Sequence, residues 1–329
     1  MEREIAIRSP ITRIGNKTTL LPILYSVFPK EYKRFIEVFG GSGAVLLGHD
    51  PVDFEVYNDV DGELVNCFRV IRNRPAEFLL DLGMLPLNSR EEFNEWLRFQ
   101  TLGCPPDIHI KSQEEIIDQL LQKEWAQALK EAMRKRTDYP EVRRAANYLK
   151  RVRNSYSSSG RSFACQPFDI RTLFDQVWEM SFRLGNVIIE QQSFEVLIPH
   201  YDRPESFFYA DPPYYNSEYV YEAEFDWEHH VMLRDTLANC KGKWLVSQVD
   251  CPEIRQLFKD FEILDFKRIH PMVQKHTPGK QFNELLIGNY DLLERERDVP
   301  LQMSLNELLG EPINVNQILK ERVTCKKRK

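Results

Sequence analysis

The feature that most constrains the fold is an apolar run, residues 35–39, which ends in the glycine-rich turn Gly40-Gly41-Ser42-Gly43. The next segments change in character: residues 44–49 have the pattern of a short helix, and residues 53–58 alternate as a strand does. Apolar residues then recur at helical spacing over residues 64–71. This order of strand, glycine turn, helix, strand and helix predicts the opening of a doubly wound α/β sheet.

The α/β pattern is interrupted and then resumes. Between about residues 75 and 153 the apolar spacing is helical, and a loop of small polar residues follows at 154–160. Further strands are expected at 187–190, 206–210, 244–249, 262–266 and 284–287, with a helix at 226–240. We therefore expect an α/β domain, a helical insert and a C-terminal extension, formed respectively by residues 1–72 with 166–292, by 73–165, and by 293–329.

The composition is that of an ordinary globular protein, with 42% hydrophobic residues, 29% charged residues and a net charge of −6. No apolar run approaches the roughly 18 residues that a membrane span needs. The charged first residues are not followed by the apolar segment of a signal peptide, which favours a cytoplasmic location. The six cysteines form no C-x-x-C pair, and His229 and His230 are adjacent rather than four residues apart, so no metal site is expected.

The strongest functional signal is the tetrapeptide Asp211-Pro212-Pro213-Tyr214, which follows the expected strand 206–210. By composition alone it would occur in about one chain of this length in a thousand. A plain turn is the alternative, because two prolines end a strand and aspartate is common in turns. The position favours a functional site, since open α/β sheets bind their ligands at the carboxyl ends of strands.

Three other segments carry weaker signals. The turn at 40–43 allows close approach of backbone to a ligand, but it lacks the spacing of phosphate-binding loops. Asp59 follows the second expected strand and could accept hydrogen bonds from ribose hydroxyls, or it could cap a helix. Gly15-Asn16-Lys17 precedes a short expected helix, and Lys17 could equally be a solvated loop residue.

The order of these segments resembles that of the Dam-type, alpha-group DNA N6-adenine methyltransferases. The shared features are Gly-Asn-Lys, Phe-Gly-Gly-Ser-Gly, Asn-Asp, a helical insert and Asp-Pro-Pro-Tyr, and they extend over about residues 10–290. Arg13 stands where the family often has an aromatic residue, and the insert does not match family members closely. The resemblance implies a Rossmann-like S-adenosylmethionine-dependent fold with target recognition in the insert.

The resemblance also implies roles for individual residues. It assigns binding of S-adenosylmethionine to Arg13, Lys17, Glu37, Phe39, Gly40, Gly41, Gly43, Asp59 and Asp211. Catalysis would depend on Asp211, Pro212 and Tyr214, since a carboxylate and a carbonyl can accept hydrogen bonds from the two N–H groups of the adenine amino group. The tyrosine would stack on that base after it leaves the duplex.

The charges are unevenly distributed, which bears on DNA binding. Residues 123–161 contain eleven Lys and Arg against four Asp and Glu, whereas residues 202–228 contain eight acidic residues against Arg203. The basic segment could contact phosphates, or it could be a solvated helical face with pairs four residues apart. The residues expected near DNA are Arg134, Lys135, Arg136, Arg153, Asn154, Tyr156 and Arg161.

The function implied is site-specific methylation of adenine N6 in double-stranded DNA, with a cognate restriction endonuclease as a candidate partner in a restriction-modification system. Two alternatives remain open. A chain with Asp-Pro-Pro-Tyr could modify cytosine N4 or RNA, although Asp rather than Ser at 211 favours adenine. The chain could also be an inactive methyltransferase fold that regulates by binding DNA, although the intact Asp211 and glycine turn argue against this.

Overall fold

The computed structural model describes residues 7–13, 15, 17–83, 90, 94, 114–115, 117–134, 139–155, 163, 172–215, 225–269 and 281–295. The chain forms two compact units, which are described separately below. Unit 1 consists of Met1–Leu21 and Arg34–Phe194, and unit 2 consists of Pro22–Lys33 and Glu195–Lys329. None of the helices in the described part of the chain is both long and apolar enough to span a membrane.

Unit 1 contains three parallel strands in the order β3-β2-β1. They are β1 (Arg34–Glu37), β2 (Phe54–Asn58) and β3 (Val187–Glu190). The register places Ile36 beside Val56, and Val56 beside Ile188. The apolar run that the sequence analysis identified is buried on β1, where Phe35 and Ile36 are fully covered. The glycine turn and the short helix α2 (Ala44–Gly48) connect β1 to β2, as predicted.

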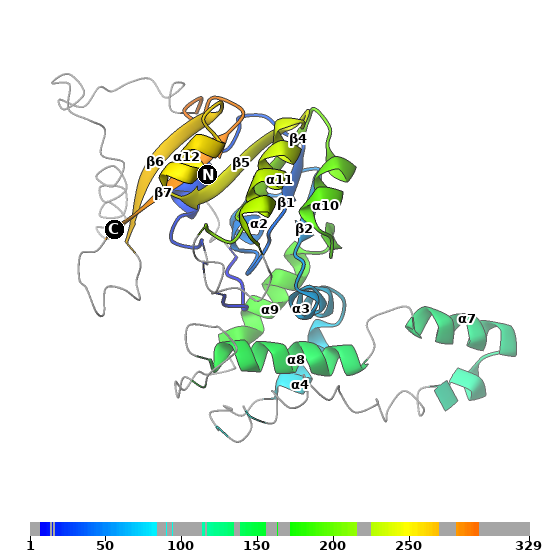
Figure 1. Cartoon of the computed structure of the whole chain (residues 1–329). Helices are drawn as coiled ribbons and strands as arrows, with labels where there is room; N and C mark the ends of the chain where they lie inside the picture. Colours follow the sequence, from blue (N-terminus) through cyan, green and yellow to red (C-terminus); the bar gives the residue numbers. More distant parts are fainter. Residues whose placement is uncertain are drawn as a thin grey trace, which may run out of the picture. The chain divides into compact units, whose positions relative to one another are not determined.

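The helices of unit 1 pack together around α3 (Figure 1). Helix α8 contacts α3 and α4, and α9 contacts the same two helices. These helices and α7 have the bounds α3 (Gly62–Asn73), α4 (Pro75–Leu82), α7 (Lys123–Arg134), α8 (Tyr139–Arg153) and α9 (Thr172–Arg183). The helical character predicted for residues 75–153 is confirmed for the described part of that segment.

Unit 2 contains four strands in the order β4-β5-β7-β6 (Figure 1). Strands β4 and β5 are parallel, and β7 is antiparallel to both β5 and β6. The strands are β4 (Ser206–Ala210), β5 (Lys243–Val249), β6 (Glu262–Ile269) and β7 (Gln281–Gly288). The helices are α1 (Leu21–Val27), α10 (Phe194–Tyr201), α11 (Trp227–Ala238) and α12 (Pro252–Leu257).

Parallel strands linked by helices in both units confirm the Rossmann-like α/β class, with seven strands among the described residues. β3 and β4 have the bounds that the sequence predicted, whereas β6 and β7 extend beyond the segments expected at 262–266 and 284–287. The division into a catalytic domain, an insert and an extension stays a prediction. Residues 296–329, most of that extension, lie outside the described residues.

Candidate cofactor-binding and catalytic sites

The turn after β1 has a shape that only glycine allows at two positions. A Cβ atom on Gly40 would lie 2.3 Å from the ring of Tyr57, well inside van der Waals contact. Gly43 has a φ of 68°, and a Cβ there would lie 2.8 Å from the ring of Phe68. Gly41 has a φ of 52°, and no described atom lies within 4 Å of where its Cβ would be. The turn is therefore packed against aromatic rings on one side and open at Gly41.

The two carboxylate oxygens of Asp59 link this turn to the start of α3. Oδ2 accepts a hydrogen bond from the Gly41 amide at 2.9 Å, and Oδ1 accepts one from the Asp61 amide at 2.9 Å. Burial is the largest influence on Asp59 and raises its pKa, although Arg13 and these two amides act in the opposite direction. The helix-cap alternative for Asp59 is wrong, because Asp61 caps α3 by accepting from the amides of Glu63 and Leu64.

Arg13 joins the cofactor-binding candidates to a helix of the predicted insert. Its guanidinium donates to Asp61 Oδ2 at 2.6 Å and to the Tyr148 hydroxyl of α8 at 3.3 Å. Burial by itself would lower the pKa of Arg13, but the neighbouring Tyr148, Asp59 and Asp61 raise it overall, so the guanidinium stays charged. Tyr148 is a residue that the sequence analysis missed, because nothing in its local sequence links α8 to residue 13.

The other residues expected at the cofactor are buried around the same turn or in the N-terminal segment. Glu37 is 2% exposed, and its Oε2 accepts from the Leu46 amide at 3.2 Å. Phe39 packs against Phe194, with ring centroids 5.8 Å apart. Lys17 is also buried, and its ammonium donates to the Gly15 carbonyl at 3.4 Å. Asn16 lies outside the described residues.

Asp211 directly follows β4 and is held by a serine of the neighbouring strand. The parallel register pairs Ala210 with Val246, so the next residues along the two strands, Asp211 and Ser247, are also neighbours. Ser247 Oγ donates to Asp211 Oδ1 at 2.6 Å, and the Tyr209 hydroxyl lies 3.1 Å from the same Oγ. The carboxylate predicted to be catalytic therefore has a defined partner inside unit 2.

The Tyr214 side chain is hydrogen-bonded to a buried carboxylate on β7. Its hydroxyl donates to Glu284 Oε2 at 2.9 Å. Burial, followed by the charges of Asp211 and Glu284, raises the pKa of Tyr214 well above its ordinary value. The phenol therefore stays protonated and remains a hydrogen-bond donor at neutral pH.

Gln248 holds the backbone on both sides of Tyr214. Its Nε2 donates to the Pro213 carbonyl at 3.3 Å, and its Oε1 accepts from the Tyr215 amide at 3.3 Å. The sequence analysis assigned no site role to Ser247, Gln248 or Glu284. The available signal was the position of the first two at the carboxyl end of a predicted strand, where sites of this fold lie.

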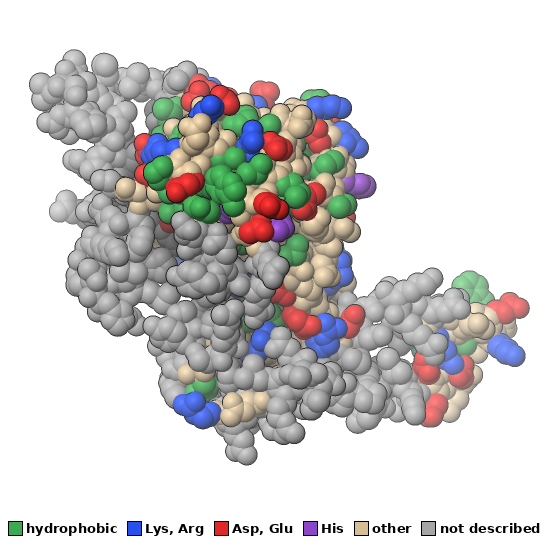
Figure 2. Space-filling model, in the orientation of Figure 1, with side chains coloured by type: hydrophobic (Ala, Val, Ile, Leu, Met, Phe, Trp, Pro, Cys, Tyr) green, Lys and Arg blue, Asp and Glu red, His purple; other side chains and the backbone are tan. Residues whose placement is uncertain are grey.

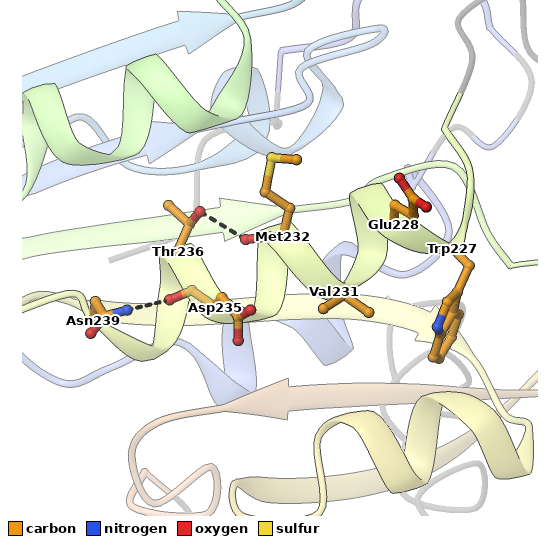
Figure 3. Close-up of a pocket in the computed structure, with 7 residues that line it drawn as sticks. All are labelled: Trp227, Glu228, Val231, Met232, Asp235, Thr236 and Asn239. Carbon is orange, nitrogen blue, oxygen red and sulfur yellow. Dashed lines mark hydrogen bonds between the residues drawn. The ribbon is translucent and has the colours of Figure 1, made fainter.

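A shallow groove of about 500 Å³ lies along α11 (Figure 3). Figure 3 shows that its lining comes from α11 and the residue that follows it: Trp227, Glu228, Val231, Met232, Asp235, Thr236 and Asn239. No residue between Asp211 and Tyr215 lines it, although the Tyr215 ring packs against Trp227 with centroids 5.1 Å apart. The groove is therefore adjacent to the Asp211–Tyr214 segment but is not formed by it.

The adjacent histidines have capping and packing roles. The His229 side chain lies 2.7 Å from Asp226 Oδ1 at the start of α11, and His230 is 2% exposed. Within the described residues, no group of three or more His, Cys, Asp or Glu side chains could hold a metal ion. Cys67 is buried, and burial raises the pKa of its thiol, as expected for a cysteine in a packing role.

The residues expected near DNA are only partly described. Lys135, Arg136, Tyr156 and Arg161 lie outside the described residues, and Arg134 is the last residue of α7. Arg153 donates to the Pro10 carbonyl at 2.8 Å. Asn154 is 1% exposed, and its amide donates to the Lys150 carbonyl at 2.8 Å. These contacts inside unit 1 give no support to a DNA contact by Arg153 or Asn154.

Several other cations of α8 have partners on the neighbouring helices α3 and α4. Arg143 pairs with Asp81 at 2.7 Å, and Arg144 pairs with Glu63. Lys150 donates to the Asp81 carbonyl at 3.1 Å. In the view of Figure 2, the described Lys and Arg side chains lie among acidic ones rather than in one continuous patch. Part of the basic segment therefore holds helices together, a role the sequence analysis did not consider.

Comparison with known proteins identifies a family for this chain and curated relatives that include two Type II methyltransferases. Residues 14–272 match the D12 class N6 adenine-specific DNA methyltransferase family. The chain is 25% identical over 294 residues to the Type II methyltransferase M1.LlaDCHI of Lactococcus lactis subsp. cremoris, which covers 85% of this chain and 95% of that protein. It is 26% identical over 218 residues to the Type II methyltransferase M.MjaIII of Methanocaldococcus jannaschii, covering 61% of this chain and 66% of that protein.

Proposed function

Because the chain belongs to the D12 class N6 adenine-specific DNA methyltransferase family, we propose that it transfers a methyl group from S-adenosylmethionine to N6 of a flipped-out adenine at a specific site in double-stranded DNA. The observation that carries this proposal is the position of Asp211. Its carboxylate stands at the carboxyl end of β4, with one oxygen fixed by Ser247, and Tyr214 follows at the same strand end.

The residues of unit 1 suit the proposed methyl donor. Asp59 is a half-buried carboxylate anchored by two amides, and it would accept hydrogen bonds from the ribose hydroxyls. The open side of the turn at Gly41 would let backbone approach the methionine end of the donor, with Glu37 nearby on β1. Lys17, Phe39 and Arg13 would complete the pocket. The donor supplies a methyl group already activated by its bond to a sulfonium.

The role proposed for Asp211 follows from the weakness of the nucleophile. The lone pair of the adenine amino nitrogen is delocalised into the ring, so the nitrogen is a poor nucleophile. The Asp211 carboxylate and the Pro212 carbonyl would accept hydrogen bonds from its two N–H groups and so localise that lone pair on nitrogen. A carbon–nitrogen bond would form as the donor's carbon–sulfur bond breaks, and Asp211 would take up the surplus proton of the nitrogen and pass it to solvent. Most of the acceleration comes from positioning and fixed charge.

Tyr214 would hold the base. An adenine must leave the duplex before its amino group can reach a carboxylate in a protein pocket. Stacking of the Tyr214 ring on that base would contribute about 1–3 kcal/mol. Pro212 and Pro213 restrict the backbone that carries both the acceptor carbonyl and the stacking ring.

The direct test measures transfer of a labelled methyl group to unmethylated DNA, followed by nucleoside analysis. We expect N6-methyladenine in DNA. Label in N4-methylcytosine or only in RNA would favour the other enzymatic alternatives, and DNA binding without any label would favour an inactive regulator. Asp211→Ala should abolish incorporation while circular dichroism and the melting temperature stay close to those of the parent protein. Turnover retained by that variant would refute the catalytic role.

The DNA-binding proposal has its own test. Reversing Arg134, Lys135 and Arg136 to glutamate should weaken binding to duplex DNA and lower its salt dependence, because fewer counterions would be released. The matched control reverses the exposed Lys30, Lys33 and Lys259 of unit 2, which changes the net charge equally. An unchanged binding constant after the first triple reversal would remove these three residues from the proposed interface.

A restriction-modification role is proposed from the names of the relatives, which are Type II methyltransferases. A cognate endonuclease would then cleave the same site that this chain protects. Methylation-sensitive sequencing of DNA from cells that express the chain would give the recognition sequence. Protection of that DNA against an endonuclease of matching specificity would support the pairing, and cleavage despite methylation would oppose it.

A further inference from the structure

Three buried polar side chains from two paired strands hold the Asp211–Tyr215 segment. Ser247 and Gln248 are on β5 and are fully buried, and Glu284 is on β7 and is 5% exposed. The β5–β7 pairing places Gln248 opposite Leu285 and Val249 opposite Glu284, so the three side chains come from the same end of the two strands. Burial of polar groups is unfavourable unless they are hydrogen-bonded, and all three are bonded to the same short segment.

The directions of the hydrogen bonds around Ser247 follow from its single hydroxyl hydrogen. An ionised carboxylate only accepts hydrogen bonds, so at 2.6 Å Ser247 donates to Asp211 Oδ1. The Tyr209 hydroxyl, 3.1 Å away, must then donate to Ser247. These two successive hydrogen bonds, from Tyr209 to Ser247 and from Ser247 to Asp211, fix the rotation of the Asp211 carboxylate and therefore the direction in which its oxygens point.

Gln248 and Glu284 act on the two sides of Tyr214 in a similar way. The side-chain nitrogen of Gln248 donates to the Pro213 carbonyl, and its side-chain oxygen accepts from the Tyr215 backbone amide. Turning the amide over would bring like groups together, so a single orientation is favoured. Glu284 accepts from the Tyr214 hydroxyl and thereby restrains the ring. The backbone and the ring of residue 214 are thus held by separate side chains.

We propose that Ser247, Gln248 and Glu284, here named the motif clamp, are positioning residues for methyl transfer. This inference rests on the proposed function and adds residues that would not contact the base or the methyl donor. Ser247 aims the Asp211 carboxylate, Glu284 sets the plane of the Tyr214 ring, and Gln248 fixes the backbone between them. Apolar residues would fill the same space on β5 and β7, but they would leave the orientation of Asp211 and Tyr214 unset.

The first experiment compares Ser247→Ala with Ser247→Thr in steady-state kinetics. Loss of the hydroxyl should lower kcat by about tenfold, while KM for DNA and for S-adenosylmethionine stays within about twofold. Threonine restores the hydroxyl and should restore most of kcat. The control is Ser206→Ala, which removes an equally buried hydroxyl that donates to the Tyr201 carbonyl at the start of β4. A purely structural serine would lower the melting temperature and leave kcat unchanged.

The second experiment is a double-mutant cycle between Tyr214 and Glu284. Tyr214→Phe and Glu284→Ala should each lower kcat by about fivefold, and the double variant should be no slower than either, because both remove one hydrogen bond. Glu284→Gln keeps an acceptor oxygen and should retain most of kcat. The control is Tyr290→Phe, which removes another buried hydroxyl, one that donates to the Val27 carbonyl.

The outcomes of these experiments distinguish a failure of the motif clamp from a failure of the proposed function on which it rests. If the parent protein transfers no methyl group, the proposed function fails and the clamp fails with it. If the parent protein is active but Ser247→Ala and Glu284→Ala keep its kcat, only the clamp is overturned. Reduced kcat with unchanged KM, rescue by threonine at 247 and non-additive effects at 214 and 284 would establish it.

Discussion

The two candidate sites, the glycine turn of unit 1 and the Asp211–Tyr214 segment of unit 2, obtain their shapes in different ways. In unit 1, the turn at Gly40–Gly43 owes its shape to the absence of side chains, with the ring of Tyr57 occupying the space a Cβ on Gly40 would need. In unit 2, the Asp211–Tyr214 segment owes its shape to side chains from neighbouring strands, which bond to its carboxylate, its backbone and its tyrosine hydroxyl.

This difference predicts different responses to substitution. A steric fit fails abruptly, because the repulsion between overlapping atoms rises steeply and the packed rings cannot move away. A hydrogen-bonded arrangement fails gradually, because each bond contributes a modest free energy and removal of one leaves the others in place. Substitutions that add a side chain in the glycine turn should therefore abolish activity abruptly. Substitutions around the Asp211–Tyr214 segment should lower activity by graded amounts.

The largest effect is expected for Gly40→Ala. The new Cβ would lie 2.3 Å from the Tyr57 ring, which is itself stacked on Phe68 with centroids 3.8 Å apart. We expect a loss of about 3 kcal/mol in the free energy of unfolding and methyl transfer below detection. Chemical denaturation and labelled-methyl transfer would measure both. Gly41→Ala is the control for stability, because it adds a Cβ in space that no described atom occupies and should cost only about 1 kcal/mol in the free energy of unfolding. Equal losses of stability at the two positions would contradict the steric account.

The next effect in size separates stacking from hydrogen bonding at Tyr214. Tyr214→Ala removes the ring as well as the bond to Glu284 and should lower kcat/KM by about a hundredfold, as expected for a stacked base. Tyr214→Phe keeps the ring and should cost about fivefold. The kinetic constants of both variants on the same DNA duplex test this gradation. If the two variants lose activity equally, stacking is the wrong account.

A smaller effect is expected for Asp59→Asn. Both oxygens of Asp59 accept from backbone amides, so an asparagine in either orientation turns its NH₂ group toward an N–H donor. KM for S-adenosylmethionine should rise by about thirtyfold, with a smaller change in kcat. Asp202→Asn is the matched control, since both oxygens of Asp202 also accept from backbone amides, those of Lys241 and Gly242 in unit 2. A rise in KM for DNA instead would place Asp59 outside the cofactor pocket.

The smallest effect is expected for Tyr57→Phe, the counterpart of Tyr214→Phe in the other candidate site. The Tyr57 hydroxyl donates to the Gly41 carbonyl at 2.7 Å, but the ring that excludes a Cβ at residue 40 is unchanged. We expect KM for S-adenosylmethionine to rise about threefold, because water can replace the lost donor at this half-exposed carbonyl. Steady-state kinetics at varied concentrations of the methyl donor would measure this. A loss as large as that of Gly40→Ala would mean that the turn depends on hydrogen bonds after all.

Much of the fold could be predicted because its signals are local. Runs of apolar residues identified the seven strands found among the described residues, and helical spacing identified α3 and α11. Helices α9, α10 and α12 were not predicted individually, because their apolar residues do not stand out from those of the adjoining strands and loops. The prediction ended β6 three residues too early and began β7 three residues too late, because most of these outer residues are polar and they pair with one another across the two strands.

The positions of Asp59 and Asp211 after strands could be predicted, but their partners could not. Asp61, not Asp59, caps α3, although either aspartate fits the local pattern. Asn154 sits in a polar sequence that suggests a surface loop, yet its amide bonds back to Lys150 and it is buried. Ser247 became a neighbour of Asp211 only through the parallel register of β4 and β5.

The sequence by itself determined the α/β class, the glycine turn and the carboxylate at the end of β4, because each depends on residues close together in the chain. The tertiary structure decided which side chains hold these elements. Tyr148 reaches Arg13 across 135 residues, and Glu284 reaches Tyr214 across 70. Such partners are chosen by strand register and helix packing, which arise from the sum of many weak contacts and leave no motif in the sequence.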